Sequence, residues 1–98
     1  MAQAKLLTII AESALRRRLV DDILRLGATG FTESEVRGQG SRGRRTSDLE
    51  GQNIRFEIVA SQATVSAILA HIEENYFENY AVIAYVVDAT VLRGEKYT

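Results

Sequence analysis

Four stretches of the chain carry the apolar pattern of β-strands. Residues 5–11 (K-L-L-T-I-I-A) and 81–87 (A-V-I-A-Y-V-V) are nearly continuous apolar runs, which is typical of central strands covered on at least one face. Residues 53–60 alternate cleanly and predict a half-buried strand. Its apolar side consists of Ile54, Phe56, Ile58 and Ala60. Residues 31–37 alternate more weakly, and we expect them to pair with 53–60 as a long hairpin.

The stretch 14–26 has the period of an amphipathic helix. Ser13 is placed to cap its N-terminus and Gly27 to follow its C-terminus. The apolar stripe consists of Leu15, Leu19, Ile23 and Leu26. We interpret the three arginines at 16–18 as part of a solvated helix face rather than as a binding patch. Their expected partners at i,i+4 are Arg17–Asp21 and Arg18–Asp22.

A second amphipathic helix begins after Ser61, which is a suitable N-cap. Its apolar face consists of Val65, Ile68, Leu69, Ile72 and Tyr76. The only histidine, His71, falls in this helix, and we expect its side chain to be partly exposed. A catalytic role is not supported, because no serine or aspartate stands beside it in the sequence.

The elements follow one another as strand, helix, strand, strand, helix, strand. This order predicts an α+β, ferredoxin-like βαββαβ sandwich, in which a four-stranded antiparallel sheet carries two helices on one face. The whole chain, residues 1–98, is expected to form one domain. Since no element remains to cover the second face of the sheet, we expect another copy of the chain to cover it.

Residues 37–47 (R-G-Q-G-S-R-G-R-R-T-S) contain four arginines, three glycines and no acidic or apolar residue. The net charge of the chain is −1, so this positive charge is local. A loop over 38–52 is long for a compact domain, and such loops are usually functional or disordered. One interpretation is a flexible, solvated hairpin tip. The uncompensated arginines, with Ser41, Thr46 and Ser47 as hydroxyl donors, favour a phosphate-binding nest instead.

Several other classes of function find little support. Residues 38–43 spell G-x-G-x-x-G, but no apolar helix pattern follows, so we reject a dinucleotide fingerprint. The chain has no cysteine and a single histidine, which argues against a disulfide framework and against a metal site. An RNA-binding sheet would need exposed aromatics, whereas Phe56 falls on the apolar side of its strand. We therefore expect no nucleic-acid partner. With neither a membrane-spanning run nor a signal peptide, we expect a cytoplasmic protein.

The motifs of the chain resemble those of the PII signalling proteins, and most closely those of their SbtB family, the cyanobacterial PII-like carbon sensors. The resemblance rests on three segments: G-x-G-S-R-x-x-R at 38–45, N-I-R-F-E-I at 53–58 and Y-F-E-N-Y-A at 76–81. V-L-R-G-E at 91–95 also matches the family pattern. The resemblance implies a homotrimer with nucleotide clefts between subunits, and a target-docking T-loop at about 38–52.

The resemblance also implies the site residues. Nucleotide binding falls on Gly40, Ser41, Arg42, Arg45, Ala81, Val82 and Arg93. Docking to a partner falls on Arg44, Arg45, Thr46, Ser47 and Asp48. The implied ligands are cyclic AMP, AMP, ADP and ATP, with Mg²⁺ or Ca²⁺ accompanying ATP, and no resident cofactor or metal is expected. The implied partner is the sodium-dependent bicarbonate transporter SbtA, which would bring the protein to the inner membrane as a peripheral subunit.

The sequence departs from the family pattern at two points that bear on regulation and on enzymatic activity. No tyrosine occurs between Phe31 and Phe56, where classical PII proteins carry a modifiable one. The C-terminal cysteine pair of some SbtB members is missing as well. We therefore expect a non-enzymatic sensor. A slow nucleotide phosphohydrolase that uses Asp48, Glu50 or Glu95, and an adaptor without a small ligand, remain as alternatives.

Overall fold

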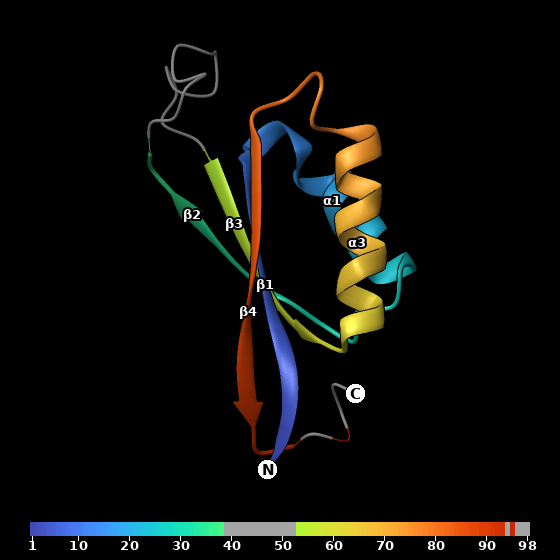
Figure 1. The fold of residues 1–98 in the computed structure, drawn as a ribbon. Helices are drawn as coiled ribbons and strands as arrows, with labels where there is room; N and C mark the ends of the chain where they lie inside the picture. The colour runs from blue at the N-terminus through green and yellow to red at the C-terminus, as the bar shows by residue number, and fades with distance from the viewer. Residues whose placement is uncertain (39–52, 94, 96–98) are drawn as a thin grey trace.

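The structure is a computed structural model that describes residues 1–38, 53–93 and 95. Its elements follow the predicted order (Figure 1). The strands are β1 (Ala2–Glu12), β2 (Thr32–Val36), β3 (Asn53–Ala60) and β4 (Val82–Val91). The helices are α1 (Arg16–Arg25), which follows the short 3-10 turn η1 (Ser13–Leu15), and α3 (Gln62–Asn75). The predicted α+β sandwich is thus confirmed.

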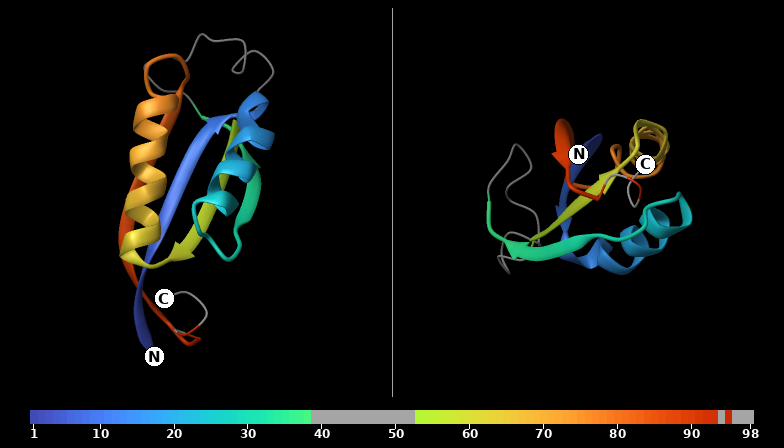
Figure 2. Two further views of the ribbon diagram at one scale, coloured as in Figure 1. Left: turned by 90° about the vertical axis from the view of Figure 1, so that its right-hand side faces the viewer. Right: turned by 90° about the horizontal axis from the view of Figure 1, so that it is seen from below.

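The four strands form one antiparallel sheet in the order β2-β3-β1-β4. Figure 2 shows both helices on the same side of this sheet. The predicted hairpin is confirmed, since β2 pairs with β3 from Thr32 opposite Glu57 to Val36 opposite Asn53. The expectation that 81–87 forms a central strand is wrong for the single chain, because β4 lies at the edge beside β1. Its apolar character instead reflects side chains that face both sides of the sheet.

The hydrophobic core lies between the helices and the inner face of the sheet. The predicted stripes of the two helices and of the strands 5–11 and 53–60 supply most of it, and one side of β4 packs partly buried against it. Its largest members are Tyr76, which follows α3, together with Leu7 and Ile9 of β1, Phe56 and Ile58 of β3, Leu19 and Ile23 of α1, and Ile68 and Ile72 of α3. Removing this apolar surface from water is what holds the two layers together.

The helix ends follow the sequence signals in part. The Ser61 hydroxyl oxygen accepts a hydrogen bond from the Thr64 amide at 3.2 Å, which confirms the cap of α3. The cap assigned to Ser13 is wrong, because Ser13 opens the 3-10 turn and α1 begins only at Arg16 without a side-chain cap. Gly27 follows α1 as predicted, with φ at 117°, and the Ala28 amide donates to the Ile23 carbonyl.

The outer face of the sheet carries an apolar row along β4. Ile83, Tyr85 and Val87 are 55%, 49% and 50% exposed. They stand opposite β1 side chains of the same face, in the pairs Ile10–Ile83, Thr8–Tyr85 and Leu6–Val87. In the region that the structure describes, no helix is long and apolar enough to span a membrane. The cover of this face by a second copy stays a prediction.

The conformation of Gly27 provides a first test of the fold. A side chain at its φ of 117° is strained, and an added Cβ would lie 3.3 Å from the Thr64 hydroxyl oxygen. We expect Gly27→Ala to lower the free energy of unfolding by about 1–2 kcal/mol. Gly30→Ala is the matched control, because a Cβ there meets nothing within 4 Å, and it should be neutral or slightly stabilising. Urea unfolding at one protein concentration measures both, and equal midpoints would contradict the strain argument.

Candidate functional site

One end of the sheet gathers the segments to which the sequence assigned binding. At the upper end in Figure 1 lie the end of β2, the start of β3, the end of β1 and the turn from α3 into β4. The Val36–Asn53 pair closes the described part of the hairpin at this end, so the described residues that flank 39–52 lie here. The predicted site residues that fall in this stretch lie outside the described residues; they are Gly40, Ser41, Arg42, Arg44, Arg45, Thr46, Ser47 and Asp48.

The turn between α3 and β4 brings Ala81 and Val82 to the same end. Its backbone is held by the Tyr80 amide, which donates to the Tyr76 carbonyl at 3.0 Å. Val82 pairs with Ala11 and begins β4. The next amide, that of Ala81, donates to a Glu12 side-chain oxygen at 2.7 Å. Sequence reasoning missed Glu12, because its partner amide lies far away along the chain.

Arg93 lies at the opposite end of the sheet. The last β1–β4 pair is Ala2 with Val91, and Arg93 follows β4 beside the N-terminus. The ten residues of β4 separate Arg93 from Ala81 by roughly 30 Å, at about 3.3 Å per residue. The structure therefore does not bring Arg93 together with Ala81 and Val82 within one chain.

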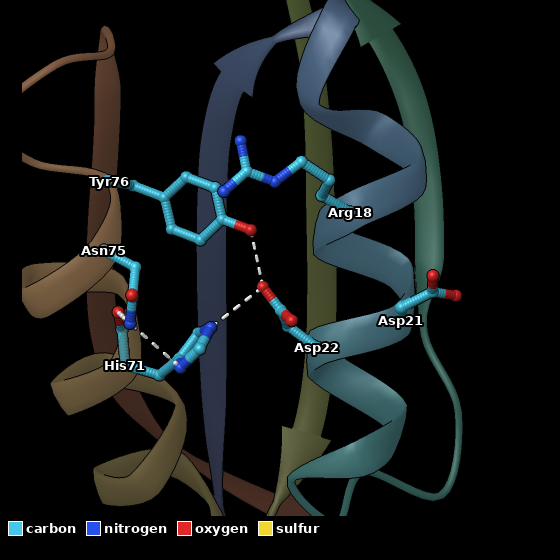
Figure 3. A pocket seen from close by; sticks show the side chains of 6 residues that line it. All are labelled: Arg18, Asp21, Asp22, His71, Asn75 and Tyr76. Carbon is cyan, nitrogen blue, oxygen red and sulfur yellow. Dashed lines mark hydrogen bonds and ion pairs between the residues drawn. The ribbon is translucent and has the colours of Figure 1, made fainter.

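A polar cluster bridges α1 and α3, with side chains of the two helices pointing toward one another (Figure 3). Asp22 of α1 lies at its centre: Tyr76 donates to its carboxylate at 2.5 Å, and His71 Nε2 lies 2.9 Å from the same oxygen. Arg25 contacts the second carboxylate oxygen at 3.1 Å. The residues that line this shallow pocket are Arg18, Asp21, Asp22, His71, Asn75 and Tyr76. None of them is a serine, threonine or cysteine nucleophile, so the His71–Asp22 pair has no group to activate.

Arg18 extends the cluster to the turn before β4. Its guanidinium lies 4.9 Å from the centre of the Tyr76 ring, and Nη1 donates to the Tyr80 hydroxyl at 3.2 Å. The expected pairs Arg17–Asp21 and Arg18–Asp22 do not form in the described part of the chain. The Arg16 guanidinium instead donates two hydrogen bonds to the carboxylate of Glu33 on β2, with nitrogen–oxygen distances of 2.6 and 2.7 Å. His71 is partly exposed as predicted, at 23% of its side chain, but an aspartate of the other helix stands beside it.

The cluster shifts the acid–base behaviour of two of its members. Burial alone would raise the pKa of Asp22, but hydrogen bonds from Tyr76, Arg25 and His71 outweigh it and lower that pKa below its ordinary value. Burial, followed by the bond to Asp22, raises the pKa of Tyr76 to about 12. The Asp22 carboxylate and the Tyr76 hydroxyl thus stabilise one another. We interpret the cluster as a structural contact that holds α3 and the turn after it against α1, and not as a site that binds a reactant.

The family model for nitrogen regulatory protein P-II matches residues 4–96 of the chain. The chain belongs to the P-II family. A PII-like signalling protein from Thermus thermophilus is 52% identical to this P-II chain, covers 99% of it over 97% of its own length, and has a TM-score of 0.85.

Two solved structures of CPII from Thiomonas intermedia are also similar to this P-II chain. One, bound to ADP, AMP and acetate, is 26% identical, with a TM-score of 0.84 and coverage of 97% of this chain and 94% of CPII. The other, bound to ADP and bicarbonate, is 25% identical, with a TM-score of 0.85 and coverage of 99% and 96%. The fold of the P-II chain is therefore shared with these relatives over nearly the whole length.

The Asp22 cluster predicts how the stability of this P-II chain depends on pH. A lowered pKa in the folded state means that Asp22 stabilises the fold above the ordinary aspartate range and that this contribution is lost as the pH falls through the lowered value. A raised pKa means that Tyr76 stabilises the fold below about pH 10 and that this contribution is lost as the pH rises towards about 12.

We expect Asp22→Asn to lower the free energy of unfolding at pH 7 by about 1–3 kcal/mol and to flatten the loss of stability in acid. Asp21→Asn removes the same charge from the exposed neighbouring position and should leave both nearly unchanged. Denaturant unfolding between pH 3 and about pH 11 measures the two profiles. If the free energy of unfolding falls with acid equally steeply in Asp22→Asn and in the native chain, Asp22 is not the source of the pH dependence.

Proposed function

We propose that this chain is a homotrimeric, adenine-nucleotide-sensing signalling protein that controls bicarbonate uptake. The observation that carries the proposal is the convergence, at one end of a P-II sheet, of the hairpin that bears the arginine-rich stretch and the Ala81–Val82 turn. Relatives with the same fold support it, because CPII is bound to ADP and AMP in one structure and to ADP and bicarbonate in another.

The proposed nucleotide site combines residues of two subunits. From one chain, Gly40, Ser41, Arg42 and Arg45 would hold the phosphates, because guanidinium groups and hydroxyls are suited to that task. The Ala81–Val82 backbone would form the wall of the same cleft. Arg93 lies at the far end of its own sheet, so we assign its phosphate contact to the cleft of a neighbouring subunit.

The trimer explains the outer face of the sheet. The row of Ile83, Tyr85 and Val87 exposes apolar surface in a single chain. Burying such a row against copies of itself is a common solution in small symmetric proteins, since association removes the same surface from water three times. Assembly of this kind would also cover the second face of β4, as its nearly continuous apolar pattern favours.

The partner and the location are proposed on the resemblance to SbtB. The stretch Arg44, Arg45, Thr46, Ser47 and Asp48 would dock on the transporter SbtA, and the cytoplasmic protein would thereby become a peripheral component of the inner membrane. The nucleotide, with Mg²⁺ or Ca²⁺ where ATP binds, would shift the population of this loop between two states because it binds one of them more tightly. We propose binding without turnover, so that ATP incubated with the protein and Mg²⁺ stays intact.

Loss of one phosphate-binding arginine tests the ligand class. We expect cyclic AMP, AMP, ADP or ATP to bind near one per chain by calorimetry, and Arg45→Ala to weaken that binding about tenfold to a hundredfold, as removal of charge-assisted hydrogen bonds does. Arg17→Ala is the matched control, since Arg17 is an exposed arginine of α1. Unchanged affinity in Arg45→Ala would contradict the phosphate role, and absence of binding by all four nucleotides would contradict the proposal.

A charge on the outer face of the sheet tests the assembly. We expect Tyr85→Glu to convert the trimer into monomers, because the new carboxylate would be buried without a partner at the subunit interface. Ala67→Glu adds the same charge to the exposed side of α3 and should leave the trimer intact. Sedimentation velocity distinguishes the two states. A trimer in both variants would show that this face is not the interface.

A further inference from the structure

Glu12 places a negative charge at the end of the sheet where the phosphates of the proposed ligand, which are also negative, would bind. Its carboxylate accepts the hydrogen bond of the Ala81 amide at 2.7 Å in a partly buried position. In the ladder Glu12 also stands opposite Asn53, the residue at which the arginine-rich hairpin rejoins the sheet. The carboxylate is therefore placed between the base of that hairpin and the Ala81–Val82 turn.

The contact has the chemistry of an anion site that is already filled. Backbone amides that no carbonyl of the sheet accepts are the donors with which proteins bind phosphate oxygens. Beyond Val82 the β1–β4 ladder ends, so the Ala81 amide is such a donor. A carboxylate oxygen at 2.7 Å satisfies it in the way that a phosphate oxygen would.

We propose that Glu12 is an internal anion that determines the charge preference of the proposed nucleotide site. Its carboxylate already accepts the hydrogen bond of the Ala81 amide, and its negative charge repels phosphate groups that bind nearby. This repulsion is stronger for ATP than for cyclic AMP, because Coulomb repulsion grows with the charge of the ligand. This inference rests on the proposed function. If Glu12 only fixed the turn through its hydrogen bond, replacing it by glutamine, which keeps that bond, would leave nucleotide affinity unchanged.

Glu12→Gln separates the two roles. The glutamine oxygen still accepts the Ala81 hydrogen bond, whereas the charge is gone. We expect the variant to bind ATP about tenfold more tightly than the native chain, and cyclic AMP at most about twofold more tightly. Calorimetry without divalent cations, at fixed ionic strength, measures both ligands. Glu73→Gln, an exposed position of α3, is the matched control and should change neither affinity.

Two results would overturn the inference. If Glu12→Gln changes neither affinity, or changes both by the same factor, the charge does not discriminate between ligands. If both affinities fall, Glu12 supports binding and does not oppose it. Neither result touches the proposed function, because nucleotides would still bind. Failure of ATP and cyclic AMP to bind the native chain, the variant and the control alike would contradict the proposed function and, with it, the inference.

A measurement on the native chain covers the case in which the variant does not fold. The Ala81 amide resonance reports its acceptor, so titration with ATP in a ¹⁵N-labelled sample should move it as phosphate repels or replaces the carboxylate. Cyclic AMP at saturation should move it less. Equal displacement by the two ligands, or none with either while other resonances respond, would contradict the proposed charge effect.

Discussion

The two helices that the structure describes cover one face of the sheet and leave the other without a described covering element, and the rest of the structure depends on that constraint. The sheet has an apolar inner face and an apolar row along β4 on its outer face, and the buried stripes of α1 and α3 both pack against the inner face. On the outer face Ile83, Tyr85 and Val87 are about half exposed to water. A chain of this size buries too little surface for such a row to be without cost. The self-association that we propose, on which the site between subunits depends, would cover this row of apolar side chains.

The turn between α3 and β4, to which we assign part of the proposed nucleotide site, is held in place by the same scaffold. Three polar contacts hold it: Asp22 accepts from the Tyr76 hydroxyl, Arg18 donates to the Tyr80 hydroxyl and Glu12 accepts from the Ala81 amide. Two of these come from α1 and one from the end of β1. A turn that is fixed in this way presents its backbone in one geometry, so less conformational entropy is lost when a ligand binds.

Most of the fold could be predicted from the sequence, whereas the polar contacts of the site could not. The strand 53–60 and the cap at Ser61 were predicted as they are found, because each depends on residues close together in the chain. Ser13 failed as a cap because the chain tightens into a 3-10 turn before α1 begins. The resemblance of a few motifs pointed to the P-II family, which the family model confirms. Glu12 was missed, since its partner amide lies near the other end of the chain.

The sequence by itself determined which residues turn inward, because hydrophobic periodicity depends only on spacing along a helix or a strand. Only the tertiary structure decided which polar groups meet: His71 with Asp22, Arg16 with Glu33, and Glu12 with Ala81. These contacts depend on strand register and on how each helix is rotated over the sheet, which no local pattern records. The edge position of β4 was decided in the same way, since strand order is a property of the whole chain.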